Sequence, residues 1–320
     1  MSEVLVIAET TAAGVRKPTL ELLTAARALG EPAAVVFGEA SDAVVAQLGE
    51  YGATKVYAVN AAEVGDYLSL PKAEAVVQIA GTANPVAILV TSGPEGKDIA
   101  ARVAVRLNSG IVPDATVVAL DGGNVVATQT VFAGRWQARS QIVRGPAVIT
   151  MRPNATSAEA AAASPSVETV DVAVSEAAKG AKITSREPKV STGRPELTDA
   201  AVVVAGGRGV GSEEGFAVIG QTADALGAAV GASRTVTDQH WAPHELQVGQ
   251  TGKTVAPSLY LAAGISGAIQ HRAGMQSSKT IVVVNKDPKA PLFQLADFGV
   301  VGDLHKVLPA LIDEVGKRKG

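Results

Sequence analysis

Short apolar runs alternate with segments of helical periodicity along the N-terminal third of the chain. The first run is VLVIA at residues 4–8, and the helical segment after it ends at Leu29, just before Gly30. Strands are predicted at residues 4–8, 33–37, 55–59 and 86–90, and helices at 20–29, 41–48, 72–82 and 97–107. Because short buried strands joined by helices pack as parallel sheets with helices on both faces, this alternation predicts a doubly wound α/β domain.

The composition limits which residues can build the core, and it excludes several classes of function. Of the 320 residues, 47% are hydrophobic but only 3% are aromatic, so the core must be built from Val, Ala, Leu and Ile, which suits buried parallel strands. The net charge of −3 argues against a nucleic-acid partner. The chain has no cysteine, which excludes disulfides, thiolate catalysis and cysteine-bound metal clusters. The N-terminus lacks the pattern of a signal peptide and no run is long enough to span a membrane, so a soluble cytoplasmic protein is expected.

The pattern changes in the middle of the chain. Strand-like segments linked by turns follow one another at residues 116–120, 124–132, 137–143 and 147–151. They are predicted to add antiparallel strands to the first sheet. Residues 184–197, TSREPKVSTGRPEL, hold two prolines and little apolar content. This stretch is the best candidate for a linker, so two domains are predicted, 1–190 and 191–320.

The α/β pattern then restarts. Strands are predicted at residues 200–205, 228–231, 258–263, 280–284 and 295–300, and helices at 213–226, 266–274 and 303–315. The second domain is therefore predicted to be a smaller parallel α/β unit. Open sheets of this kind bind ligands at the carboxyl ends of their strands, so the loops that follow these strands are the places to search for a site.

Two of these loops combine glycine with arginine. Residues 206–212, GGRGVGS, follow a strand and precede a helix, which is the context of a phosphate-binding loop, although the strict G-x-G-x-x-G spacing fails. The alternative is an ordinary tight turn. Residues 230–235, VGASRT, also lie at a strand end and place Ser233 and Arg234 toward the same crevice. The alternative there is an exposed loop with a solvated arginine.

The most ligand-like stretch is residues 246–275, in which two glycine-rich loops flank one apolar run. The first loop, 248–253, reads VGQTGK, and the second, 264–267, leads into a predicted helix with Gln270 and His271. Small residues let a backbone approach a ligand closely, and helix starts offer free N–H groups. The alternatives are simple turn capping in the first loop and an ordinary helical histidine.

Other chemistries find no support. The G-K-T at residues 252–254 lacks the glycine spacing and the preceding strand of a P-loop, and no G-x-S-x-G elbow is present. His240, His244 and His305 show no metal-ligand spacing, so no metal is expected. No residue stands out as a general acid or base, so no catalytic residue is predicted. A strand end at 283–288 and Asp303 complete the candidate set, although Asp303 could simply be an N-cap.

Taken together, these loops resemble the C-terminal signature of electron transfer flavoprotein alpha subunits. The resemblance covers about residues 194–315 and is carried by segments in the family's order: GGRG at 206–209, VGASR at 230–234, VGQTGK at 248–253, GISGAIQH at 264–271 and IVVVNKDP at 281–288. The first domain resembles the family more loosely, at 91–93, at 150–153 and in the turn at 132–134.

The resemblance implies a heterodimer with a beta subunit, in which domain 191–320 is a Rossmann-like domain that binds FAD. It implies a nucleotide-hydrolase-like domain 1–190 at the interface with the beta subunit, and an AMP held by that partner. The pair would act as an electron carrier, without turnover of a small molecule. It would accept electrons from acyl-CoA and other flavin dehydrogenases and pass them to a membrane quinone oxidoreductase, as in fatty acid β-oxidation.

The resemblance also implies site residues. Arg208 and Ser233 would contact the diphosphate and adenosine side of FAD, and Arg234 would lie near the isoalloxazine. Thr251 would reach flavin N5, and a protonated or donating His271 would lie near O2. The full implied set is Arg208, Ser233, Arg234, Val248, Gly249, Gln250, Thr251, Ser266, Gly267, Ala268, Ile269, Gln270 and His271, with Asn285, Asp303 and Leu304 on the AMP half of FAD.

Two alternatives to the simple carrier remain. One is an FAD-binding subunit of a flavin-based complex that bifurcates electrons or reduces enoyl-CoA. A second FAD in the partner, in place of AMP, would favour it. The other alternative is a nucleotide-binding module without redox chemistry, which would not carry a flavin.

Overall fold

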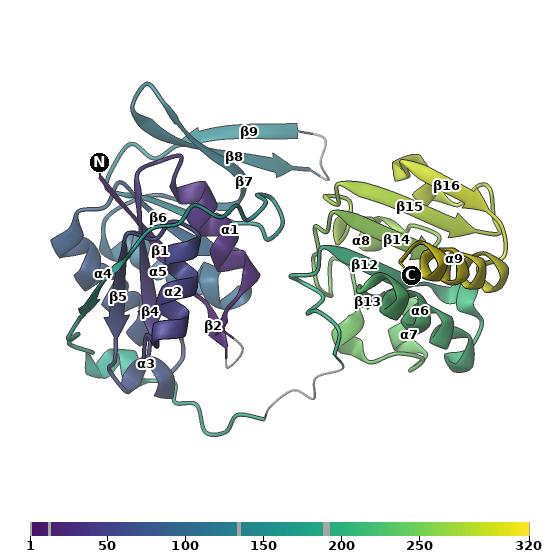
Figure 1. Cartoon of the computed structure of the whole chain (residues 1–320), viewed down its shortest axis with the longest axis horizontal. Coiled ribbons are helices and arrows are strands. Elements are labelled where there is room, and N and C mark those ends of the chain that lie inside the picture. The colour runs from purple at the N-terminus through teal and green to yellow at the C-terminus, as the bar shows by residue number, and fades with distance from the viewer. Residues whose placement is uncertain (1, 12–13, 133–135, 188–192, 320) are drawn as a thin grey trace. The chain divides into compact units, whose positions relative to one another are not determined.

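The computed structural model describes residues 2–11, 14–132, 136–187 and 193–319, and the chain divides into two compact units, Met1–Pro188 and Lys189–Gly320 (Figure 1). Part of the predicted linker, residues 188–192, lies outside the described residues, as do Ala133 and Gly134 of the turn at 132–134. Within the described residues, no helix is both long and apolar enough to cross a membrane.

The described part of the first unit is built on a nine-stranded sheet. In spatial order its strands are β11 (Ser166–Thr169), β5 (Lys55–Val59), β4 (Glu31–Phe37), β1 (Glu3–Ile7), β6 (Ala87–Thr91), β10 (Ala147–Met151), β7 (Ile111–Asp121), β8 (Asn124–Val131) and β9 (Trp136–Gln141). The first strand of the sequence lies at the centre and pairs in parallel with β4 and β6. The predicted doubly wound sheet is therefore confirmed.

The predicted antiparallel additions to the sheet are confirmed only in part. β7 with β8 and β8 with β9 are antiparallel, as predicted. β10, however, lies between β6 and β7 and is parallel to both, so the antiparallel assignment of residues 147–151 was wrong. All five residues of β10 are buried. Burial on both faces is typical of an interior parallel strand, whereas the turns that precede it in sequence suggested another hairpin.

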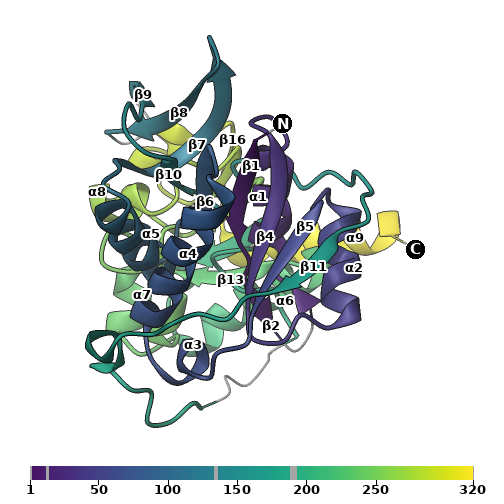
Figure 2. The ribbon, with the colours of Figure 1, turned by 90° about the vertical axis from the view of Figure 1, so that its left-hand side faces the viewer.

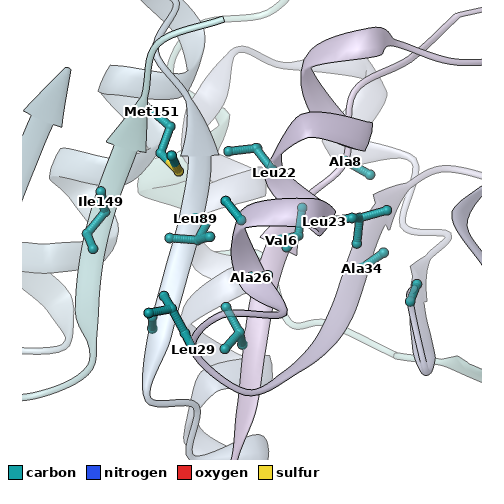
Figure 3. Close-up of a cluster of buried hydrophobic side chains, with 14 of the residues drawn as sticks. Val6, Ala8, Leu22, Leu23, Ala26, Leu29, Ala34, Leu89, Ile149 and Met151 are labelled. Carbon is teal, nitrogen blue, oxygen red and sulfur yellow. The ribbon is translucent and has the colours of Figure 1, made fainter. Parts of the chain in front are cut away.

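Alternate residues of each central strand pack into two separate cores. Val4 and Val6 of β1 belong to the core under α1 and α2, of which Figure 3 shows a part, while Leu5 and Ile7 belong to the core under α4 and α5. Figure 2 shows the unit turned so that α4 and α5 face the viewer. Its described helices are α1 (Lys17–Ala26), α2 (Asp42–Glu50), α3 (Glu63–Asp66), α4 (Ser69–Ala83), α5 (Pro94–Arg106) and the 3-10 turn η1 (Glu176–Lys179). Two short strands, β2 (Thr10–Thr11) and β3 (Gly14–Val15), pair antiparallel with each other.

The second unit contains a five-stranded sheet, parallel throughout its described strands. In spatial order these are β13 (Ala229–Ala232), β12 (Val202–Gly206), β14 (Leu259–Ala263), β15 (Thr280–Asn285) and β16 (Phe298–Val301). Helices α6 (Glu213–Leu226) and α9 (Leu304–Lys319) cover one face. The other face packs against Val248, Val255, Met275 and η4 (Pro291–Leu295), which are parts of loops and of short elements. The predicted two-domain α/β architecture, with a Rossmann-like second domain, is confirmed.

The strand order creates a switch point between β12 and β14. The chain leaves β12 toward β13 on one side and returns to β14 on the other, so the loops after β12 and β14 diverge and leave a crevice at the carboxyl edge of the sheet. Three short elements lie in the loops: η2 (Arg208–Val210), α7 (Arg234–Asp238) and α8 (Ile269–Ala273), with η3 (His244–Leu246) nearby. The helix predicted from residue 266 begins only at Ile269, because Gly267 has a φ of 90°, which a right-handed helix cannot contain.

Candidate functional site

A cavity of about 610 Å³ opens at this switch point. It is lined by the loops that follow four parallel strands, β12, β13, β14 and β15, and by the loop at 247–251. The volume lies within the range of roughly 300–1,000 Å³ that is usual for small-molecule and cofactor sites. The described topology therefore brings together most of the loops that the sequence singles out.

Glycines let the two loops at the switch point touch through their backbones. The N–H of Gly207 donates to the carbonyl of Ala263 at 2.9 Å, and the N–H of Gly209 donates to that of Gly264 at 3.0 Å. A Cβ on Gly207 would lie 2.3 Å from the carbonyl oxygen of Gly264, so no other residue fits there without a backbone shift. This contact holds Arg208 at the cavity wall, where its guanidinium is free to meet an anion.

Ser233 and Arg234 follow β13 and also line the cavity. The N–H of Ser233 donates to the carbonyl of Gly206 at 2.9 Å, which fixes this loop beside the loop after β12. The Arg234 side chain is 68% exposed and pairs with Asp238 at 3.2 Å, one turn along α7. Arg234 therefore places a positive charge at the cavity, and this charge is paired with the exposed carboxylate of Asp238.

A buried glutamine orients the hydroxyl of Thr251. Gln247 is 2% exposed; its Oε1 accepts from the Thr237 hydroxyl at 2.9 Å and its Nε2 donates to Thr251 Oγ1 at 3.0 Å. Because the threonine oxygen already accepts this hydrogen bond, its own hydrogen remains to be donated to a ligand in the cavity. The simple turn-capping alternative for Thr251 is therefore not needed to explain its contacts.

His271 is the most deeply buried titratable group at the cavity. The side chain is 6% exposed, and its Nε2 lies 3.0 Å from the hydroxyl of Tyr260, which is fully buried. Burial lowers the pKa of His271 to about 4, and a polar contact with the backbone of Val248 opposes this shift only in part. The neutral ring is therefore the favoured form, so of the two states implied for His271, protonated or neutral and donating, burial favours the second.

The other predicted residues divide into two groups. Val248, Gly249, Gln250, Ser266, Gly267, Ala268, Gln270 and Asn285 all line the cavity. Asn285 donates from Nδ2 to the carbonyl of Ile265 at 3.0 Å, so its side chain ties the end of β15 to the loop after β14. Residues 266–268 precede α8, where N–H groups lack partners within the helix.

Three predicted residues do not line the cavity. Ile269 is 70% exposed. Asp303 accepts from the N–H of His305 at 3.0 Å and pairs with Lys286 at 3.1 Å, so it caps α9 as the alternative interpretation held. Leu304 is buried in the core between β12, β14 and α9, and packs near Gly264. The structure thus gives Asp303 a role as the cap of α9, while Leu304 packs beside Gly264 in the loop after β14.

Several lining residues were not among the predicted site residues. They are Gly209, Thr235, Asp238, Gln247, Gly264, Ile265, Asp287 and Ala290. Asp238 has a signal in the sequence, since it lies four residues after Arg234 and such pairs meet on a helix. Gly209, Gly264, Ile265 and Asp287 belong to the motifs already noted. Gln247 has no such signal, because only the fold brings it between Thr237 and Thr251.

The residues present fit a dinucleotide cofactor such as FAD. The cavity combines glycine-rich backbone, two arginines and hydroxyl groups, as a diphosphate and a polar heterocycle require. In addition, Nδ1 of His271 is buried and has no hydrogen-bond partner among the described residues, which is unusual for a buried polar atom. No cluster of three potential metal ligands is found in the part of the chain that the structure describes.

Fold and cavity together define a two-domain α/β protein whose second domain has a cavity of the size and composition that a nucleotide cofactor requires. Models of the electron transfer flavoprotein domain and of the electron transfer flavoprotein FAD-binding domain match residues 4–175 and 196–276. The chain is 49% identical to the electron transfer flavoprotein subunit alpha of Mycobacterium leprae over 100% of both chains. It is 38% identical to that of Bacillus subtilis (98% of this chain, 97% of the relative) and 36% identical to Protein FixB of Clostridium saccharobutylicum (96% and 94%). The chain therefore belongs to the electron transfer flavoprotein alpha subunit family.

Proposed function

We propose that this chain binds FAD in the cavity at the β12–β14 switch point and carries electrons between protein partners. The observation that carries the proposal is the position of the cavity: residues 208–271 supply most of its lining, and a model named for FAD binding matches residues 196–276. Bound there, FAD supplies the isoalloxazine ring that takes up and releases electrons.

The residues around the cavity have separate roles in this proposal. Arg208 and the N–H groups of residues 266–268 bind the diphosphate. Arg234 sets a positive charge beside the flavin ring, where it favours added negative charge. Thr251 would donate its hydroxyl hydrogen to N5 of the flavin, and His271 would serve as a neutral hydrogen-bonding group for O2. In this proposal no residue moves a proton on a small substrate, as expected of an electron carrier.

The partners follow from the family. We propose a heterodimer with an electron transfer flavoprotein beta subunit that holds AMP, with the unit Met1–Pro188 at the interface between the subunits. Flavin dehydrogenases such as acyl-CoA dehydrogenases would donate the electrons, and a membrane quinone oxidoreductase would accept them, as in fatty acid β-oxidation.

The test uses the purified heterodimer, an acyl-CoA dehydrogenase and its acyl-CoA substrate. The expected result is loss of the oxidised flavin absorption band when all three are mixed, and no loss when the dehydrogenase is omitted. A heterodimer whose bound flavin stays oxidised with every acyl-CoA dehydrogenase tried would contradict this choice of donor.

A second candidate is the FAD-binding subunit of a bifurcating or enoyl-CoA-reducing complex. The observation that favours it is the similarity to Protein FixB of Clostridium saccharobutylicum, a relative whose name differs from electron transfer flavoprotein subunit alpha. The cofactor content of the heterodimer separates the two candidates. AMP with a single FAD supports the simple carrier, whereas two FAD and no AMP support the complex.

A further inference from the structure

Tyr260 carries a hydroxyl group into the middle of an apolar core. The side chain lies on β14, has no exposed surface, and packs in the cluster with Val203, Ala262 and Met275. A phenylalanine would fill this position without any polar atom, whereas a buried hydroxyl must be hydrogen-bonded to avoid a large desolvation cost. The partner here is Nε2 of His271 at 3.0 Å, with the two rings tilted by 59°.

The direction of this hydrogen bond follows from the burial of both rings. Burial raises the pKa of the Tyr260 hydroxyl, so the phenol keeps its hydrogen and must donate it. Within the described residues, Nε2 of His271 is the acceptor at hydrogen-bond distance. An imidazole nitrogen that accepts carries no hydrogen, so the hydrogen of the neutral ring is on Nδ1.

The helix that carries His271 is in close contact with the loop 248–253. The N–H of Gln250 donates to the carbonyl of Gln270 at 2.8 Å, and a Cβ on Gly274 would lie 2.4 Å from the nitrogen of Gly249. Loop 248–253 therefore rests on α8, which carries His271. Tyr260 lies outside the cavity lining while His271 is part of it, so Tyr260 acts on the cavity only through His271.

We propose that Tyr260 is a positioning residue of the cofactor site, which holds His271 in one orientation and as the tautomer with its hydrogen on Nδ1. The second ring nitrogen is then a fixed donor, Nδ1–H. The backbone of Val248 lies close to the ring, but among the described residues no group meets the geometry of a hydrogen bond to Nδ1. A flavin carbonyl oxygen is the class of acceptor that fits it. The part of this inference that concerns the flavin rests on the proposed binding of FAD; the tautomer itself does not.

The first measurement is nitrogen NMR of the full chain with ¹⁵N-labelled histidine, at neutral pH and without FAD. The chain has four histidines, and His271→Gln identifies the signal of His271 by its loss. The expected result is a His271 ring with its hydrogen on Nδ1 in the wild type and a mixture of tautomers in Tyr260→Phe. Tyr57→Phe is the matched control, because Tyr57 also has a buried ring, and its hydroxyl donates to Glu3 at 2.8 Å in the other unit. It should leave the signal unchanged.

The second measurement is the affinity for FAD and the flavin reduction potential in the same variants, with the beta partner present. Tyr260→Phe is expected to weaken FAD binding about five- to tenfold, the effect of one hydrogen bond, and to shift the potential, while Tyr57→Phe does neither.

The outcomes separate the two proposals. A wild-type His271 with its hydrogen on Nε2 overturns the inference, whether or not Tyr260→Phe folds. An unchanged tautomer together with unchanged FAD affinity in Tyr260→Phe overturns it as well. A wild-type chain that binds no FAD would instead contradict the proposed function. The tautomer measured by NMR would still decide whether Tyr260 fixes the orientation of the His271 ring.

Discussion

Two buried side chains decide which hydrogen-bonding groups the cavity offers. Gln247 directs the hydroxyl of Thr251, and Tyr260 directs the ring of His271. Thr251 and His271 could be predicted from the sequence, because Thr251 lies in a glycine-rich loop and His271 lies in the short helix that follows another, and the pattern of both is distinctive. Gln247 and Tyr260 could not, since a glutamine before a loop and a tyrosine in a strand look like ordinary residues until the fold shows what they contact.

At the scale of single residues, Gln247→Leu should change the reduction potential of the flavin through Thr251. The leucine keeps the volume but removes the donor to Thr251 Oγ1, so the hydroxyl is free to rotate. We expect Gln247→Leu and Thr251→Ala to shift the flavin potential in the same direction. The double variant should shift it by less than the sum, because both remove one interaction. Potentiometric titration of the heterodimer measures this, with the exposed Thr254→Ala as control; additive shifts would contradict the coupling.

The burial of His271 should make the second unit sensitive to acid. The pKa of His271 is lowered from 6.5 to about 4 in the folded chain. Between pH 6.5 and 4 the histidine of the unfolded chain is therefore protonated, while the ring of the folded chain stays neutral. The contribution of His271 to stability is thus complete above pH 6.5. It is lost as the pH falls toward 4, by up to about 3 kcal/mol.

The measurement is denaturant unfolding of the FAD-free chain over this pH range. The chain has two tryptophans, so with Trp136 replaced by Phe the fluorescence of Trp241 reports on the second unit. His271→Gln is expected to lose less stability than the parent between pH 6.5 and 4. Parallel curves for the two proteins would show that the buried ring does not cause the acid sensitivity.

At the scale of elements, the positions of strands and helices follow from the sequence but their pairing does not. The apolar runs predicted at 4–8, 33–37, 55–59 and 86–90 all overlap strands of the first sheet. The direction of β10 was predicted wrongly because the run at 147–151 contains no information about its neighbours. Its partners β6 and β7 lie far back in the sequence. Pairing is decided by how the whole sheet buries its faces.

The loops after β12 and β14 should not tolerate a side chain at Gly207, where their backbones are in contact. In Gly207→Ala the added atom would lie 2.3 Å from a backbone oxygen and 2.6 Å from the Cα of Ile265, so the backbone must shift. We expect a loss of about 1–3 kcal/mol in the stability of the second unit, together with weaker FAD binding.

Gly316→Ala is the matched control, since Gly316 lies in α9 with nothing near its Cβ. It should stabilise the unit by up to about 1 kcal/mol through helix propensity. Unfolding followed by Trp241 fluorescence compares the two. A Gly207→Ala chain as stable as the parent would contradict the close contact between the loops.

At the scale of the molecule, the chain separates a large unit from a small one that holds the cavity. All the residues that line the cavity lie in the unit Lys189–Gly320. The sequence could indicate this division, because the pattern of strands and helices restarts after a proline-containing stretch. It could not indicate the shape of the cavity, because loops after four strands form the wall together and their distances depend on the register of the sheet.

The central claim is that the cavity at the β12–β14 switch point binds FAD, and an equilibrium titration of the FAD-free chain with FAD tests it most directly. Flavin fluorescence should report a single saturable site per chain. Ser266→Trp should weaken this binding, because Ser266 lines the cavity and has an exposed side chain, so the indole would fill the cavity without disturbing the core. No saturable binding by the wild type, or equal binding by both proteins, would contradict the claim.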